Sequence, residues 1–207
     1  MKKLICVFVF SLVLAGSVWA QGGALEVRGL YFHPVDKRFQ DVYSSGAVFG
    51  VEGILGLGKH VDLWISGDYF RKKGELIYSK KETTVRIIPI AAGLRWRFSQ
   101  DAYQFYISAG AGYFLFQEEN IMGTVNASKI GYLGKAGYSL KIIRGFYLNA
   151  HLQYAHCSIQ PLEIQTHIGG LSLGIGIGYD FGLGEKEEKW IWREIRGRGE
   201  DWQKNHL

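Results

Sequence analysis

Residues 168–181 read IGGLSLGIGIGYDF, and no other stretch indicates the fold as clearly. From Leu171 to Phe181 every odd position carries an apolar or aromatic side chain, whereas the even positions carry glycine, serine or aspartate. Side chains that alternate in this way lie on opposite faces of a β-strand. The stretch therefore predicts a strand with one oily face and one face of small or polar residues.

The same alternation recurs along the chain. It is found in residues 24–33, 46–57, 60–71, 83–98, 102–116, 129–141, 145–157 and 168–181. Each of these eight segments reaches the roughly 9–11 residues with which a tilted strand crosses a bilayer. Short turns at 58–59, 99–101 and 142–144 alternate with longer polar loops at 34–45, 72–82, 117–128 and 158–167. This asymmetry is typical of bacterial outer-membrane barrels, and an even strand count places both ends of the barrel on the short-turn, periplasmic side.

Composition narrows the class of protein. The chain has 28 glycines, 3 prolines and 14% aromatic residues. After the first twenty residues it contains no apolar run as long as a membrane-spanning helix. Without Lys2 and Lys3, 22 basic residues face 19 acidic ones, a net charge of +3 that does not indicate nucleic acid binding. Without Cys6, Cys157 is alone, so an intramolecular disulfide is excluded.

The N-terminus has the layout of a secretory signal peptide. Two lysines precede the apolar residues 4–15, and small residues then lead to Ala20, which Gln21 follows. We predict cleavage between Ala20 and Gln21, with residues 1–20 as the signal peptide and residues 24–181 as the barrel. The apolar run is short for a transmembrane helix, which makes an uncleaved anchor the alternative. Ser17 stands where a lipoprotein signal would carry its cysteine.

Two orientations of the alternating faces are open. A soluble sandwich or a lipocalin-type barrel would point the apolar face inward, and a membrane barrel would point it outward. Aromatic residues cluster near strand ends, as interfacial girdles do, for example at Tyr31, Tyr69, Trp96, Tyr103 and Tyr179. The opposite face carries charges of both signs: Glu26, Arg28, Glu52, Asp62, Asp68, Arg95, Arg97, Lys135 and Lys141. We therefore predict an all-β, eight-stranded antiparallel transmembrane barrel whose lumen holds paired charges and leaves few paths for water.

Residues 24–181 resemble the small porin-like outer-membrane β-barrel family, of the OmpA transmembrane-domain type. The most specific part is Gly176-x-x-Tyr179-x-Phe181, which is similar to the terminal assembly signal of such barrels. Two features depart from that signal: Gly174 stands where a polar residue is usual, and 26 residues follow Phe181. The resemblance implies location in the bacterial outer membrane and contact with its lipid, lipopolysaccharide and the barrel assembly machinery.

Residues 182–207 form a charged extension with Trp190, Trp192 and Trp202. Its six basic and six acidic residues balance. Two interpretations stand side by side: a helix that lies on the inner membrane face or binds a periplasmic partner, and a solvated tail.

Neither the glycine patterns nor the histidines complete a phosphate-binding loop or a metal site. Gly53-x-x-x-x-Gly58-Lys59-His60 has histidine where a phosphate-binding loop needs serine or threonine, and a strand rather than a helix follows. Gly174, Gly176 and Gly178 alternate inside a strand, so we expect them to make room for large side chains opposite. The histidines have no partner at metal-ligand spacing, and we predict neither a metal site nor a cofactor.

One pair of residues points to an enzyme. His156-x-Ser158 resembles part of the His-x-Ser pair of outer-membrane lipid A deacylases, and Glu163 is the only acid nearby. The flanking arginine and asparagine of that family are missing. The leading hypothesis is therefore a non-enzymatic barrel that serves envelope integrity or presents its loops to external partners. A deacylase using His156, Ser158 and Glu163, and a narrow channel for small solutes, are the alternatives.

Overall fold

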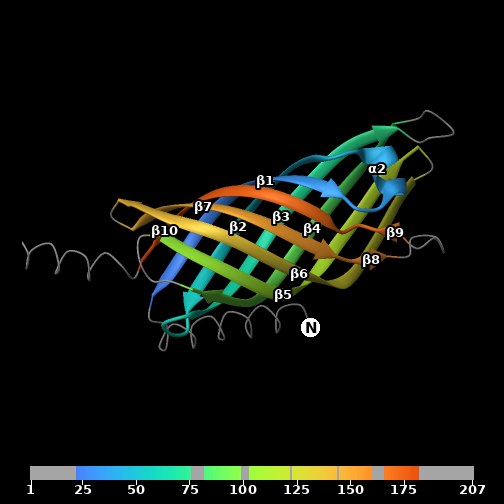
Figure 1. Cartoon of the computed structure of the whole chain (residues 1–207). Coiled ribbons are helices and arrows are strands. Elements are labelled where there is room, and N and C mark those ends of the chain that lie inside the picture. The colour runs from blue at the N-terminus through green and yellow to red at the C-terminus, as the bar shows by residue number, and fades with distance from the viewer. Residues whose placement is uncertain are drawn as a thin grey trace, which may run out of the picture.

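The computed structural model describes residues 22–75, 82–98, 103–121, 123–143, 145–159 and 166–181. Within them, eight strands close into one barrel in the order β1-β10-β7-β6-β5-β4-β3-β2, and all neighbours are antiparallel (Figure 1). The strands are β1 (Gly23–Pro34), β2 (Gly46–Gly56), β3 (Val61–Glu75), β4 (Glu82–Arg97), β5 (Tyr103–Asn120), β6 (Gly123–Ile143), β7 (Phe146–His156) and β10 (Gly170–Asp180). Pairing of β1 with β10 from Ala24 opposite Asp180 to Pro34 opposite Gly170 closes the sheet. The predicted fold class is confirmed.

The two ends of the barrel differ. At the end that we call the turn end, short connections join β2 to β3, β4 to β5 and β6 to β7, and both barrel termini lie there. At the opposite end, the loop end, helix α2 (Lys37–Tyr43) and the short paired strands β8 (Ser158–Ile159) and β9 (Thr166–His167) lie together (Figure 1). The predicted signal peptide, its cleavage site at Ala20 and Gln21, and the tail 182–207 lie outside the described residues.

Two of the predicted loops were wrong. Residues 72–82 and 117–128 contain extensions of strands, so that Glu75 pairs with Glu82 and Asn120 pairs with Gly123. These hairpins project past the apolar belt, where the outer face meets water, and their polar residues therefore resemble a loop in sequence. A third predicted loop, 34–45, contains α2. Its N-cap is Asp36, whose carboxylate accepts a hydrogen bond from the backbone N–H of Arg38.

The outer face of the barrel is apolar around its middle. Large apolar side chains are exposed there, including Ile175 at 72%, Phe49 at 67%, Ile130 at 67% and Leu173 at 65%. Contact of so much apolar surface with water would be unfavourable in free energy. Such a belt is stable only in contact with hydrocarbon, and the barrel is therefore a transmembrane one. No helix among the described residues combines the length and the apolar character needed to cross a bilayer.

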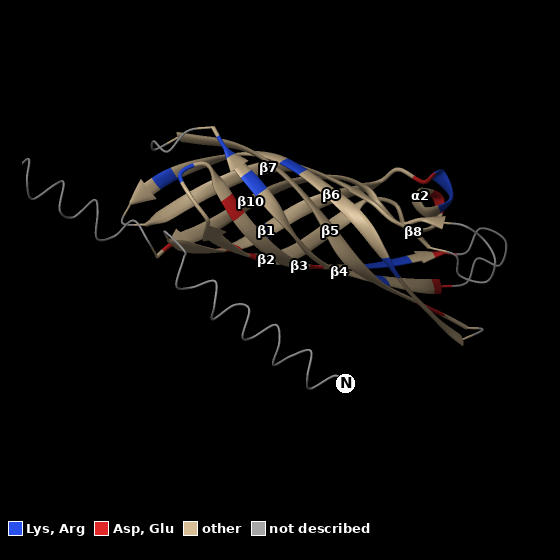
Figure 2. Cartoon of the chain, turned by 90° about the horizontal axis from the view of Figure 1, so that it is seen from below, with Lys and Arg blue, Asp and Glu red and all other residues tan. Residues whose placement is uncertain are grey.

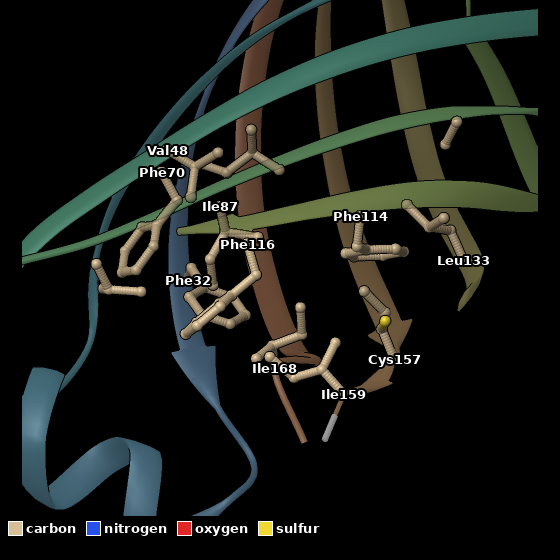
Figure 3. Packing of buried hydrophobic residues seen from close by; sticks show 14 of the residues in the cluster. Phe32, Val48, Phe70, Ile87, Phe114, Phe116, Leu133, Cys157, Ile159 and Ile168 are labelled. Carbon is tan, nitrogen blue, oxygen red and sulfur yellow. The ribbon is translucent and has the colours of Figure 1, made fainter. Parts of the chain in front are cut away.

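The inner face is divided into two layers along the barrel axis. Toward the turn end, charged and polar side chains fill the lumen, among them Glu26, Arg28, Glu52, Arg95 and Lys135. Toward the loop end, apolar side chains fill it instead (Figure 3). An eight-stranded barrel is just wide enough for its own side chains to fill. The charged layer follows the predicted inward face, whereas the apolar layer was not predicted.

Candidate functional site

The charged layer is built around Glu52. This carboxylate on β2 pairs with Arg28 of β1, Arg95 of β4 and Lys135 of β6, and Arg28 Nη1 lies 2.5 Å from Glu52 Oε2. Arg28 also donates to Asp68 of β3, with Nη2 2.7 Å from Oδ1 and Nε 3.0 Å from the same oxygen. All five side chains are at most 5% exposed. Five strands are thus cross-linked through one buried network, in which each charge has an opposite partner.

Aromatic rings complete the surroundings of two of these cations. Lys135 Nζ lies 3.5 Å from the centroid of the Trp64 ring, and Arg95 Cζ lies 4.0 Å from the centroid of Tyr106. Both distances are in the range of cation–π attraction. Trp64 is fully buried and donates from Nε1 to the carbonyl of Leu94 at 3.2 Å. The rings hold the cations in place and exclude water from the same volume.

Three predicted lumen residues lie apart from Glu52. Arg97 Nη2 is 2.8 Å from Asp62 Oδ1 and 3.1 Å from the carbonyl of Gly58, near the turn end. Lys141 is half-buried on β6, six residues or about 20 Å along the strand from Lys135. The structure therefore brings five of the nine predicted charged residues into one network and separates Arg97 and Asp62 as a second, more peripheral pair. Glu26, on the same inward face, accepts a hydrogen bond of 2.8 Å from Asn149.

The glycines of β10 make room for side chains from the neighbouring strands, as expected. A Cβ atom at Gly174 would lie 2.7 Å from Cε1 of His151, and one at Gly176 would lie 2.6 Å from Oε1 of Glu26. At Gly178 a Cβ atom would meet the ring of Tyr147. Gly176, the glycine of the predicted assembly signal, is one of these three glycines. The two aromatic residues of that signal, Tyr179 and Phe181, point outward at the turn end, where their rings are 5.2 Å apart.

A second, apolar layer of side chains lies in the lumen toward the loop end. Phe32 and Phe70 meet edge to face at 5.2 Å, Phe116 lies beside Ile87, and Phe114 lies near Leu133 and Cys157 (Figure 3). The sequence does contain a sign of this apolar layer. Toward the loop end both faces of the strands are apolar, as in residues 30–32 and 113–116. The strict alternation that marks the rest of the barrel wall breaks where the lumen itself becomes apolar.

Helix α2 caps this layer. Phe39 and Tyr43 are each 4% exposed, and their rings pack at 4.9 Å. The Tyr43 hydroxyl lies 3.0 Å from Oγ1 of Thr83 on β4. Burial raises the pKa of Tyr43 well above its usual value. The helix is thereby fixed to the mouth of the barrel by two aromatic side chains and one buried hydrogen bond.

At the rim, Ser158 has a different partner from the predicted one. Its Oγ lies 2.6 Å from Nδ1 of His167, the residue opposite it in the β8–β9 pair. His156 points outward, with its ring centroid 5.6 Å from that of His167, and Glu163 lies outside the described residues. His167 was missed because it follows Ser158 by nine positions in a predicted loop, and only strand pairing makes them neighbours.

Asp36 joins this rim to α2. Its Oδ2 accepts a hydrogen bond of 3.0 Å from the backbone N–H of His167 while its Oδ1 caps the helix. Burial acts to raise the pKa of Asp36, but the hydrogen bonds from the backbone N–H groups of His167 and Arg38 outweigh it, and the pKa lies below its usual value. In the described part of the chain, no group of three or more His, Cys, Asp or Glu side chains is placed to hold a metal ion.

No protein-family model matches the sequence, and no curated protein matches it either. Solved structures do share its fold. The outer membrane protein OprG from Pseudomonas aeruginosa is similar with a TM-score of 0.59 at 14% identity, over 78% of this chain and 99% of that one. For Neisserial surface protein A (NspA) the TM-score is 0.58 at 13% identity, over 76% and 96%. Ail, the attachment invasion locus protein of Yersinia pestis, gives 0.50 at 13%, over 77% and 98%. The chain thus has the fold of the small outer-membrane β-barrels of bacteria.

Proposed function

We propose that this protein is a non-enzymatic barrel of the bacterial outer membrane, with a sealed lumen and a loop end that acts at the cell surface. The observation that carries this proposal is the double closure of the lumen. A buried ion network around Glu52 fills its turn half, and an apolar core capped by α2 fills its loop half. Side chains that fill both halves of the lumen leave little room for a solute path, which argues against a pore. The loop end then remains as the functional surface.

Each layer opposes solute passage for its own reason. An ion that enters the charged layer has to separate buried pairs, which costs several kcal/mol per uncompensated charge. A polar solute that enters the apolar layer loses its hydration without gaining hydrogen bonds. The two costs apply in series along one axis. This arrangement favours a closed barrel over the narrow channel, which was the third hypothesis.

Conductance of single molecules in planar bilayers tests the seal. We expect the wild-type protein to show no steady conductance. The double variant Glu52→Ala with Phe39→Ala removes the centre of the network and the main anchor of α2, and we expect it to conduct. The matched control is Asp41→Ala, because Asp41 is exposed on α2 and belongs to neither layer. Steady conductance of the wild type would overturn the proposal.

The loop end offers a defined surface rather than a set of free loops. Lys37, Arg38 and Asp41 are exposed on α2, and the contact between Asp36 and His167 holds the helix beside the β8–β9 pair. The likeness in fold to Ail, a protein whose name refers to attachment and invasion, supports a surface role of this kind. Envelope integrity is the other role that the same location would serve.

Complementation separates these two roles. A strain that lacks the protein is scored for uptake of large antibiotics and detergent, and for adhesion to surfaces. It is then complemented with the wild type or with the triple variant Lys37→Glu, Arg38→Glu and Asp41→Lys. A surface-binding role predicts that the triple variant restores the permeability barrier but not adhesion. If deletion changes neither property, the surface role fails.

A lipid-modifying hydrolase is the second candidate, favoured by one observation. A serine hydroxyl at 2.6 Å from a histidine ring nitrogen is the contact through which histidine acts as a general base toward serine. In this interpretation His167 takes the role first given to His156. Mass analysis of lipid A from cells with Ser158→Ala or wild-type protein tests it. Identical acylation in both strains and in the deletion strain removes the hydrolase.

A further inference from the structure

Two arginines face each other on the outside of the barrel. In the register of β3 and β4, Arg71 lies directly opposite Arg86. Arg71 lies two positions from Tyr69, which is 40% exposed, and Arg86 lies four positions from Ile90, which is 50% exposed. Because outward residues alternate along a strand, both arginines share the face of the apolar belt. Directly opposite residues place their Cβ atoms about 4.5–5.5 Å apart.

This pair has no acidic partner among the described residues. Arg86 Nη1 donates to Oε1 of Gln117 at 3.2 Å, while its Nε is buried and makes no hydrogen bond. Like charges directly opposite in a sheet are destabilising unless an anion compensates them. Lys73, the next outward residue on β3, has Glu82 at 3.9 Å, and both side chains are more than 70% exposed. The other acids on this face, Glu75 and Glu119, lie farther from the belt.

The depth of the pair matches that of lipid headgroups. Arg71 and Arg86 come immediately after the apolar residues of their strands toward the loop end, about 7 Å beyond the last of them. On the adjacent strand, Tyr113 lies opposite Ile90 and its hydroxyl is 2.5 Å from Oγ of Ser128, as expected for an aromatic residue at the interface. Lys and Arg colour the ribbon at the end where α2 lies (Figure 2).

We propose that Arg71 and Arg86 together bind the phosphate group of a lipid headgroup in the leaflet at the loop end. Two guanidinium groups offer paired N–H donors that match phosphate oxygens, and the anion would relieve the repulsion between them. The proposal rests on the outer-membrane location argued above, in which phosphorylated lipopolysaccharide fills that leaflet. The site is distinct from the lumen and from the rim serine.

Binding to the folded full-length protein in detergent micelles tests this site. The probes are lipopolysaccharide, the same lipopolysaccharide after removal of its lipid A phosphates, and inorganic phosphate. We expect the wild type to prefer the phosphorylated lipid, and Arg71→Gln or Arg86→Gln to weaken its affinity about tenfold each, the effect of one lost charge-assisted hydrogen bond. Lys73→Gln is the matched control, because Lys73 shares the strand and the face but pairs with Glu82.

Each other outcome overturns the assignment. Equal affinity for the dephosphorylated lipid, or unchanged affinity in both arginine variants, removes the phosphate site. Inorganic phosphate bound as tightly as the lipid would exclude a headgroup as the ligand. Retention of the heat-dependent gel shift by each variant shows that the barrel is folded. A wild-type protein that inserts into bilayers but shows no phosphate preference refutes this site alone, whereas failure to insert refutes the proposed function.

Discussion

Arg28 Nη1 lies 2.5 Å from Glu52 Oε2 inside the barrel, and each side chain is 1% exposed. The two residues are 24 positions apart and come from neighbouring strands. Glu52 also holds Arg95 and Lys135, so a single carboxylate compensates three cations. The stability of the turn half of the lumen therefore depends unusually strongly on one residue.

Removal of this carboxylate is expected to be the most destabilising single change in the lumen. Glu52→Gln leaves Arg95 and Lys135 buried without the anion that they share, a change that costs about 3–5 kcal/mol of unfolding free energy. Urea unfolding of the protein in lipid vesicles measures it. Asp62→Asn is the control, since its partner Arg97 is 22% exposed and can rehydrate, and less than half the loss is expected. Equal losses would show that the network is not cooperative.

The glycine wall is expected to be sensitive to a single methyl group. Gly174→Ala places a carbon 2.7 Å from the His151 ring, and we expect a loss of about 1–3 kcal/mol from overpacking. Combination with His151→Ala should recover most of it, which a double-mutant cycle measures. At Gly29, where a Cβ would meet no atom within 4 Å, alanine should be neutral. A Gly174→Ala loss that persists in the double variant would place the strain elsewhere.

Loss of the helix anchor is expected to release α2 without unfolding the barrel. Phe39→Ala removes a ring that is 4% exposed and packs against Tyr43. We predict faster amide hydrogen exchange in residues 37–43 and unchanged exchange in the β5–β6 ladder, because local opening needs less free energy than global unfolding. Asp41→Ala on the exposed side is the control. Uniform acceleration throughout the barrel would mean that α2 supports the whole fold.

Acid is expected to loosen the same helix through Asp36. Its pKa is lowered in the folded protein, so its contribution to stability is present above the unfolded-state pKa of about 3.9 and is lost as pH falls through the folded value. The protection factors of the α2 amides, in which the intrinsic pH dependence of exchange is divided out, should therefore be lower at pH 3 than at pH 6. Asp36→Asn keeps a capping side chain but does not titrate, and the protection factors of its α2 amides should lose most of this pH dependence. An unchanged pH dependence in the variant would exclude Asp36 as its source.

The strands and the orientation of their faces could be predicted from the order of residues alone. Period-two alternation in segments such as 168–181 requires a wall with an oily side and a small or polar side, and the mixed charges placed that second side inward. Inward Glu52 and Arg28 followed from that local rule. The room beside Gly174 and Gly178 followed from it as well.

Which of these residues meet depends on how the barrel closes. The contact of Glu52 with Lys135 spans 83 positions and depends on the register of strands that are not adjacent in the barrel, and no local pattern encodes it. The pair of Ser158 with His167 and the facing arginines 71 and 86 depend on the register of paired strands, and the cap formed by Phe39 depends on how α2 packs against the barrel. Alternation is a property of one strand, whereas ion pairs, caps and paired cations are properties of two or more elements brought together by strand register, by packing of α2 and by closure of the sheet.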